Sequence, residues 1–155
     1  MRKKNLEVKD NDEIRAIISR CDVCRIALID NDVPYIVAMN FGYMERNPAL
    51  IYFHCANEGR KLDILNQNNV VCFQMDTDHK LIKADMACDF TMKYSSIMGS
   101  GRIYIVNSEE ERQAGLNCIM KQYSGRDDYS FKPSAMKAAT ILRLEIDELR
   151  AKQLK

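Results

Sequence analysis

Short apolar segments separated by turn residues dominate this sequence, and they constrain its fold more than any other feature. Branched and aromatic side chains, which favour β-strands, are concentrated in these segments. The segments comprise residues 24–29, 34–43, 49–55, 70–76, 86–94, 96–106 and 140–147. Asp30-Asn31-Asp32 is a turn signal between the first two segments, which are therefore expected to pair as a hairpin. The sequence predicts a mainly β fold, an antiparallel β-barrel with accessory helices.

The accessory helices are expected at the edges of the barrel. Asp10 followed by Glu13 has the spacing of a capping box at the start of a first helix. A second, short amphipathic helix is expected over residues 60–66. A third is expected to begin after Ser108, because three glutamates follow it and the helix dipole favours acids in the first turn. Residues 78–84 are expected to form a polar loop.

The chain is expected to form one domain over residues 1–155, with a tail at residues 1–11 and a charged tail at residues 148–155. A length of 155 residues suits one domain, and an apolar fraction of 46% is enough to build a core. Since no linker and no internal repeat divides the sequence, nothing in it indicates a second domain.

The charge balance argues against two classes of partner. Lys and Arg total 23 against 22 for Asp and Glu, which gives a net charge of +1. Binding to nucleic acid or to an anionic membrane needs a clustered basic excess, which this composition does not supply. No apolar run approaches the length of a bilayer span, and the basic start lacks the apolar core of a signal peptide. We expect a soluble, cytoplasmic protein.

The six cysteines are interpreted as structural residues. Cys21 and Cys24 have the CxxC spacing of a redox or zinc motif, but the sequence has no second CxxC and no histidine at ligand spacing. A free cysteine in an apolar segment behaves as a small hydrophobic residue. We therefore predict no metal site.

Gly59-Arg60-Lys61 is the strongest candidate for a binding site. The free N–H groups and the positive dipole end of a helix start favour an anion, and Arg60 and Lys61 add two positive charges. This arrangement is a candidate phosphate cradle. The alternative is that two basic residues decorate an exposed helix start, because the motif is neither a Walker loop nor GxGxxG.

Catalytic side chains are not singled out by the sequence. His54, at the end of an apolar segment, could contact a ligand, transfer protons near neutral pH or ligate iron, although a satisfied histidine is the commoner case. His79 is interpreted as part of a solvated loop. Tyr94-Ser95-Ser96 offers three hydroxyls that could line a polar ligand, and no GxSxG elbow is present.

Several segments resemble the 5-nitroimidazole-resistance (Nim) branch of the pyridoxamine 5′-phosphate oxidase-like flavoproteins. The similarity extends over about residues 12–146. It is carried by PYIVAMNFGY at 34–43, IYFH at 51–54, EGRKLD at 58–63, TMKYSSIMGSG at 91–101, Ile119-Met120 and YSGRD at 123–127. The resemblance implies a split β-barrel that binds flavin mononucleotide (FMN) at a homodimer interface.

The resemblance also assigns roles to residues of this sequence. Arg60 and Lys61, with Gly59, would hold the flavin phosphate, and His54 would lie near the ring or the ribityl chain. The isoalloxazine ring would be lined by Val37, Ala38, Met39 and Asn40. Ser95 and Ser96 would approach from an adjoining strand or from the partner subunit.

The implied function is that of an FMN-dependent oxidoreductase. Its small-molecule electron acceptor would be nitroaromatic or quinone-like, and a nicotinamide nucleotide is one candidate donor. The biosynthetic oxidase of this superfamily has basic residues on the strand equivalent to residues 36–41, and this chain has none there, which argues against pyridoxamine phosphate as the substrate. Two alternatives stay open, a haem-binding or haem-handling split barrel with His54 as the axial ligand and a dimer without a cofactor.

Overall fold

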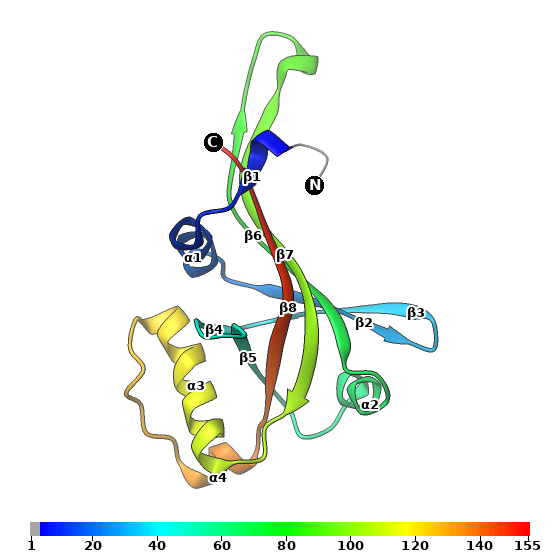
Figure 1. Ribbon diagram of the computed structural model, residues 1–155, viewed down its shortest axis with the longest axis vertical. Coiled ribbons are helices and arrows are strands. Elements are labelled where there is room, and N and C mark those ends of the chain that lie inside the picture. The colour runs from blue at the N-terminus through cyan, green and yellow to red at the C-terminus, as the bar shows by residue number, and fades with distance from the viewer. Residues whose placement is uncertain (1–3) are drawn as a thin grey trace.

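The computed structural model describes residues 4–155, and its centre is one antiparallel sheet (Figure 1). The strands are β1 (Glu7–Val8), β2 (Cys24–Asp30), β3 (Val33–Met39), β4 (Gly42–Met44), β5 (Leu50–Cys55), β6 (Val70–Ile82), β7 (Thr91–Ile105) and β8 (Thr140–Leu154). They follow the order β3-β2-β6-β7-β8-β5-β4, and β1 pairs with β8 beside this path. The prediction of a mainly β fold is confirmed.

Four α-helices and two short 3-10 turns accompany the sheet within the described residues. The helices are α1 (Asn11–Ser19), α2 (Arg60–Gln67), α3 (Glu109–Ser124) and α4 (Pro133–Lys137), and the 3-10 turns are Lys4–Leu6 and Ala87–Asp89. The Asp10 side chain accepts a hydrogen bond from the Glu13 N–H and caps α1, as predicted. The Ser108 side chain caps α3 in the same way by accepting from the Glu111 N–H.

The predicted hairpin is formed by β2 and β3. Their register runs from Cys24 opposite Met39 to Asp30 opposite Val33. The turn residues Asn31 and Asp32 both have positive φ, at 47° and 67°. Such a two-residue turn matches the right-handed twist of the strands that it joins, and Asn and Asp tolerate this conformation better than most residues.

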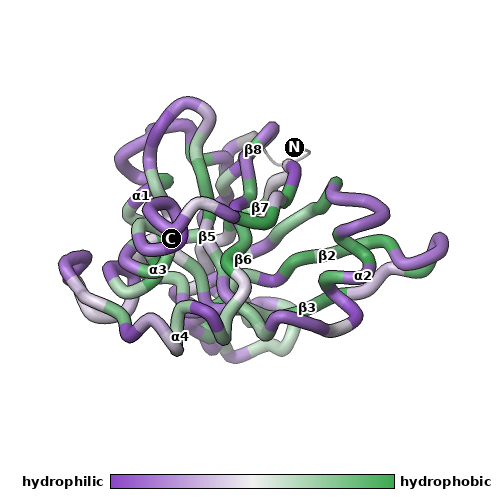
Figure 2. Tube along the Cα trace, turned by 90° about the horizontal axis from the view of Figure 1, so that it is seen from below, coloured by the Kyte–Doolittle hydropathy of each residue, from purple (hydrophilic) through white to green (hydrophobic). Residues whose placement is uncertain are grey.

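The main hydrophobic core lies on one side of the sheet, beneath α1 and α2. Ile17 and Ile18 of α1 and Leu62, Ile64 and Leu65 of α2 are buried there against the strands. Among the sheet residues of this core are Ile26, Leu28, Ile51, Phe53, Phe73 and Ile97. In Figure 2 the strands carry most of the hydrophobic colour, while hydrophilic residues are frequent in the loops at the periphery.

A smaller core lies where α3 packs on the sheet. Cys118 and Ile119 of α3 are buried together with Tyr52 and Leu50 of β5 and Ile141 of β8. The approach is close at Gly115, where an added Cβ would stand 2.7 Å from the Tyr52 ring. The region where β5 pairs with β8 therefore lies between the main core on one side and α3 on the other.

The opposite side of β3, β2, β6 and β7 carries exposed side chains, and we call it the outer face. Because side chains alternate along a strand, the residues between the core positions of these strands point to it. Among them are Ile29, Arg25, Ile36, Ala38, Val70, Cys72, Met98 and Ser100. Ile36 and Met98 are both 63% exposed, so this face has large apolar side chains without cover from the described chain.

Several sequence-based boundaries were wrong, because strands continue through polar residues or begin later than their apolar residues suggested. The predicted loop at 78–84 is mostly strand, since β6 extends to Ile82. The strands expected at 86–94 and 96–106 are a single strand, β7, preceded by a loop that includes residues 86–90. β6 and β7 form hydrogen bonds with each other over most of their length. This pairing favours the strand conformation even where the local residues are polar.

The predicted tails also take part in the sheet. Residues 148–155, expected to be a charged tail, form the last part of β8 as far as Leu154 and pair with β7. In the other tail, Glu7 and Val8 form β1 and pair with Lys152 and Ala151. Residues 1–3 of that tail lie outside the described residues.

Beyond the pairing of Tyr94 with Leu154, β6 and β7 continue as a two-stranded ribbon that we call the arm. The arm comprises residues 80–93, with Lys80 to Ile82 paired to Lys93 to Thr91. It projects from the body at the top of Figure 1. None of the described helices is long and apolar enough to cross a membrane.

Candidate functional site

The start of α2 has an unusual backbone. Gly59 precedes the helix with φ 133°, a conformation that side-chain-bearing residues rarely adopt, and an added Cβ would have nothing within 4 Å. Among the described residues no side chain caps the helix start. The Leu62 N–H bonds to the Gly59 carbonyl at 2.8 Å, whereas the N–H groups of Arg60 and Lys61 have no hydrogen-bond partner among residues 4–155. Together with the positive end of the helix dipole, these two N–H groups favour an anion.

Arg60 is held in place by two residues of the β2–β3 hairpin. Its Nε donates to the Asp30 carboxylate at 2.8 Å, and its guanidinium lies over the Tyr35 ring, 4.5 Å from the centroid. Within residues 4–155 neither terminal Nη nitrogen has a hydrogen-bond partner, and the side chain is 58% exposed. The guanidinium is thus anchored through one nitrogen while its fork stays available for a bidentate oxyanion.

Lys61, the second residue of α2, acts on the end of β5 through its charge. Burial raises the pKa of the Cys55 thiol, and the positive charge of Lys61 partly opposes that rise. Arg60 contacts the β2–β3 hairpin, and the charge of Lys61 acts on Cys55 at the end of β5. Arg60 and Lys61 thus put two positive charges at the start of α2, and their role as a phosphate cradle stays a prediction.

The segment predicted to line an isoalloxazine ring is the end of β3. Val37 and Met39 point to the core side, and Met39 is only 8% exposed, whereas Ala38 and Asn40 are exposed on the opposite side. β3 is an edge strand, since β2 is its sole neighbour in the described sheet. Its second row of backbone N–H and C=O groups is consequently open to a ligand.

His54 is exposed and points away from the main core. Its neighbours Phe53 and Cys55 share the opposite side of β5, and Cys55 is the residue on which the charge of Lys61 acts. His79, expected in a loop, also lies in a strand, where its Nε2 is 3.0 Å from the Asp76 carboxylate. His54 is therefore one of two strand-borne imidazoles.

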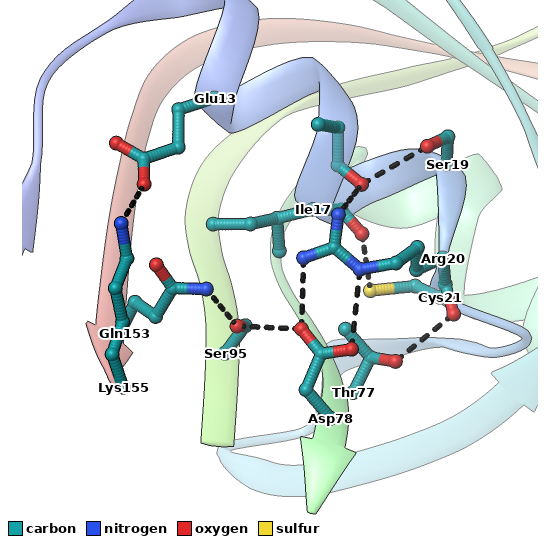
Figure 3. A network of polar contacts seen from close by, with 11 residues as sticks. Glu13, Ile17, Ser19, Arg20, Cys21, Thr77, Asp78, Ser95, Gln153 and Lys155 are labelled. Atoms are coloured by element: carbon teal, nitrogen blue, oxygen red, sulfur yellow. Dashed lines mark hydrogen bonds and ion pairs between the residues drawn. The ribbon is translucent and has the colours of Figure 1, made fainter. Parts of the chain in front are cut away.

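Ser95 and Ser96 lie at the other end of the sheet from α2. The Ser95 hydroxyl is fully buried, donates to Asp78 at 2.8 Å and accepts from the Gln153 amide at 2.8 Å (Figure 3). Ser96 is half-buried and pairs with Lys152. β7 is three strands from β3, roughly 14 Å at the usual strand spacing. The single chain does not bring these serines to the α2 cradle.

Asp30 and Tyr35 are site residues that the sequence alone did not identify. Asp30 was interpreted only as part of a turn, and Tyr35 only as a strand residue. Their contact with Arg60 depends on the hairpin register and on a chain separation of 30 residues between Asp30 and Arg60. The turn signal in the sequence could have placed Asp30 at the hairpin end, but not beside α2.

A groove of about 890 Å³ lies elsewhere, between α1, β4 and α3. None of the predicted cofactor-binding residues lines it. Its lining includes Arg15, Ile18, Tyr43, Met44, Cys118 and Lys121. In Figure 1 these elements are on the left, and α2 is on the right, so the groove and the cationic site are separate features.

The CxxC cysteines lie in the core. Cys21 and Cys24 are at most 1% exposed, and burial raises the pKa of each thiol to about 12. The Cys21 thiol is further directed toward the Ile17 carbonyl at 3.3 Å. Among residues 4–155 no group of three or more His, Cys, Asp or Glu side chains is arranged to hold a metal ion.

The family of the chain follows from a family model described as pyridoxamine 5′-phosphate oxidase, which matches residues 10–153. The chain belongs to this family. Its similarity to the Nim branch is confirmed by a structure from Bacteroides thetaiotaomicron, a candidate 5-nitroimidazole antibiotic resistance protein. That protein is 30% identical with a TM-score of 0.82, and the match covers 96% of this chain and 86% of that one. No curated protein matches this chain.

Two more distant structures share the fold. The flavocytochrome Anf3 from Azotobacter vinelandii is 19% identical with a TM-score of 0.79, over 100% of this chain and 72% of that one. The FAD and haem binding protein from Mycobacterium smegmatis is 12% identical with a TM-score of 0.81, over 96% and 73%. At such identities the likeness concerns the fold alone. Together with the family match, it confirms the predicted split-barrel class.

Proposed function

We propose that this protein is an FMN-dependent oxidoreductase that acts as a homodimer on a small electron acceptor of the nitroaromatic or quinone type. The observation that carries the proposal is the uncapped start of α2 beside Arg60. Arg60 is anchored through Nε by Asp30 and stacked on Tyr35, and its Nη fork is left open. A phosphate there would meet backbone N–H groups, a forked cation and Lys61.

The β3 edge supports the placement of a flavin ring. The edge carries unpaired backbone donors and acceptors, and it belongs to the same hairpin that anchors Arg60 through Tyr35. A molecule with a phosphate at one end and a flat polar ring at the other suits this combination. In the proposed complex Gly59, Arg60 and Lys61 hold the phosphate, and residues 37–40 orient the ring.

In this proposal the flavin, the cationic residues, the hairpin and the second copy have separate roles. The flavin, when bound, supplies the electron and hydride transfer, with a nicotinamide nucleotide as the proposed donor. The cationic cradle supplies affinity, and the hairpin fixes the distance between cradle and ring. A second copy of the chain on the outer face covers Ile36 and Met98 and supplies the wall that the single chain lacks. His54 and Ser96 are assigned to contacts with the flavin or with that second copy, whereas the buried Ser95 hydroxyl keeps its contacts with Asp78 and Gln153.

A comparison of two flavins tests the phosphate cradle. Arg60→Gln combined with Lys61→Gln should weaken FMN binding about 100-fold or more while riboflavin binding stays unchanged, because only FMN carries the phosphate. Quenching of flavin fluorescence measures both affinities. Arg46→Gln combined with Lys132→Gln is the matched control, since both are exposed cations away from α2.

Two outcomes of that experiment count against the proposal. Equal losses for FMN and riboflavin would mean that the variant disturbs the fold rather than a phosphate contact. Failure of the wild-type protein to bind either flavin would remove the flavin function itself.

A haem-binding role is the second candidate, and the exposure of His54 on β5 is the observation that favours it. An imidazole free of the core is able to serve as an axial iron ligand. His79 is less suitable because its Nε2 is already 3.0 Å from the Asp76 carboxylate. The relatives described as a flavocytochrome and as an FAD and haem binding protein show that both cofactors occur on this fold.

Haem titration of two variants separates the histidines. If haem is the ligand of His54, His54→Ala should abolish the Soret shift that the wild-type protein produces, and His79→Ala should retain it. A full Soret shift in His54→Ala would exclude His54 as the axial ligand.

A further inference from the structure

β6 is irregular at Asp78, and this irregularity changes which side chains reach the outer face. Asp78 has φ 60°, a conformation that residues other than glycine rarely adopt, and Asp78 and His79 together stand opposite a single β7 residue, Tyr94. In a regular strand Asp78 would share the outer face with Asp76. Instead, its carboxylate bonds to the buried Ser95 on the core side (Figure 3), and His79 turns toward Asp76. Bulges of this kind are frequent beside functional sites, where they redirect a side chain.

The His79 imidazole lies against a carboxylate that two other side chains hold in place. Its Nε2 is 3.0 Å from one Asp76 oxygen. The other oxygen accepts from the Arg25 Nη1 and from the Gln74 amide, both at 2.7 Å. Arg25, Gln74 and Asp76 alternate with core residues along their strands, so the cluster lies on the outer face. A carboxylate fixed in this way orients an imidazole, as in catalytic triads.

The second ring nitrogen of His79 is left for a ligand. Among residues 4–155 its Nδ1 has no hydrogen-bond partner, and the side chain is 50% exposed. Two cations share this part of the outer face. Arg25 contacts Asp76 directly, and Lys152 pairs with Ser96, which itself pairs with Asp76. An imidazole transfers protons near neutral pH, and nearby cations favour an oxygen that gains negative charge during a reaction.

The cluster is adjacent to the segment proposed to orient the flavin ring. The sheet register places Ala38 opposite Arg25 and Arg25 opposite Gln74, so these residues form one row across the outer face. Ala38 is therefore about 10 Å from Gln74 at the usual strand spacing. The Arg25 side chain extends from this row to Asp76. The outer face thus offers an aromatic ligand a place between the proposed ring site and His79.

We propose that His79, oriented by Asp76, donates a proton to a quinone-type electron acceptor bound on the outer face. Arg25 and Gln74 are positioning residues, because they hold the Asp76 carboxylate. The inference rests on the proposed function, because the electrons come from its flavin. It adds a catalytic residue to that function and favours acceptors that need a proton.

The balance of quinone reduction defines what His79 supplies. A quinone becomes a hydroquinone by gaining two electrons and two protons. A hydride from the anionic reduced flavin brings both electrons and one hydrogen to one quinone oxygen, and the flavin returns to its oxidised form. The protonated imidazole gives its Nδ1 proton to the other oxygen, and the neutral ring regains a proton from solvent.

Two electron acceptors separate proton delivery from electron delivery. Menadione, a quinone, takes up protons when it is reduced, whereas ferricyanide accepts single electrons without protons. In the FMN-loaded, chemically reduced protein, His79→Gln should slow reoxidation by menadione about 100-fold and leave reoxidation by ferricyanide unchanged. Stopped-flow recording of the flavin absorbance measures both rates. Asp76→Asn should show the same selectivity with a smaller loss, and Lys83→Gln, at an exposed position of the arm, is the control.

Two further readouts do not depend on turnover. The FMN affinity of His79→Gln should equal that of the wild type, because the variant leaves the start of α2 intact. In the oxidised, FMN-loaded wild type, 1-naphthol should shift the Nδ1 NMR signal of His79, since this phenol resembles a partly reduced quinone but accepts no hydride. The signal is assigned by its loss in His79→Gln, because the chain has only two histidines.

Three results would overturn the proposal: a menadione rate unaffected by His79→Gln, equal slowing with both acceptors, or a His79 signal that does not respond to 1-naphthol. In each case, FMN binding and ferricyanide reduction by the wild type would leave the proposed function standing. A wild type that binds no FMN would refute the proposed function and this inference together.

Discussion

Arg20 and Asp78 form a two-point ion pair although 58 residues separate them in sequence. The Arg20 Nε donates to one carboxylate oxygen of Asp78 at 3.1 Å, and an Nη donates to the other at 2.8 Å (Figure 3). Arg20 ends α1, and Asp78 lies where β6 is irregular, just before the arm. The pair therefore ties the first helix to the base of the arm.

Stability in acid should depend on Asp78. Hydrogen bonds from Arg20 and Ser95 lower its pKa below the ordinary value. The pair consequently contributes stability above the ordinary carboxyl pKa, and the contribution is lost as the pH falls through the lowered value. Asp78→Asn should cost about 1 kcal/mol at neutral pH and flatten the decline below about pH 4, measured by urea unfolding at several pH values.

Asp85→Asn is the control for this measurement, because Asp85 is exposed in the arm loop. It should leave the pH dependence of the wild type unchanged. If Asp78→Asn loses stability in acid as steeply as the wild type, Asp78 does not carry the effect.

The CxxC thiols should be inert in the folded protein. Burial raises the pKa of Cys21 and Cys24 to about 12, so at pH 8 only about one thiol in ten thousand is ionised. Iodoacetamide should label both only after urea unfolding, as read from the masses of their peptides. Rapid labelling of either cysteine in the native protein would contradict a structural role.

Tyr123→Phe should destabilise the junction between β3 and α3. The Tyr123 hydroxyl accepts the Phe41 N–H at 3.0 Å and donates to the Asp22 carbonyl at 2.8 Å. Its loss leaves the N–H of a buried residue unpaired, at a cost of about 1–3 kcal/mol in the free energy of unfolding. Because Phe41 directly follows residues 37–40, FMN binding should also weaken.

Tyr129→Phe is the comparison for that variant, because within residues 4–155 the Tyr129 hydroxyl bonds only to the exposed Ser124, at 3.1 Å. Its unfolding free energy should change by less than about 0.5 kcal/mol. Equal effects of the two variants would show that the Phe41 contact has no special weight.

Gly99→Ala should destabilise the sheet through crowding. An added Cβ would stand 2.3 Å from the Glu148 carbonyl oxygen and 2.5 Å from the Phe73 ring. The ring or the strand must shift, and such overpacking costs about 1–3 kcal/mol. Urea unfolding should show this loss for Gly99→Ala and little change for Ser100→Ala, whose side chain points to the outer face. A neutral Gly99→Ala would mean that β8 yields easily at this point.

The parts of the fold that were predictable are those set by neighbouring residues. Asp10 and Ser108 cap helices within three residues of themselves, and Asn31-Asp32 closes a hairpin locally. The strand formed by residues 148–154 was missed because its charged residues suggest a solvated tail. Pairing with β7, which lies about fifty residues earlier, decides its conformation, and local composition does not report that pairing.

The candidate site likewise contains residues that are predictable from local sequence and residues that only the fold brings together. Gly59 and the basic pair after it are adjacent in sequence, so the helix start was predictable as an anion site. Asp30 and Tyr35 act on Arg60 across the fold, and only the hairpin register brings them there. Ser95 looked like an available hydroxyl, but the contacts with Asp78 and Gln153 that occupy it come from distant strands.

The position of β8 has a consequence for synthesis of the chain on the ribosome. β8 is the last strand of the sheet in sequence order, yet it lies in the interior, between β7 and β5. Until residues 140–154 have left the ribosome, β5 and β7 each present an unpaired edge to solvent or to a neighbouring nascent chain. The last strand to be synthesised is thus the one that joins the two halves of the sheet. A chain truncated shortly before residue 140 would have two open strand edges.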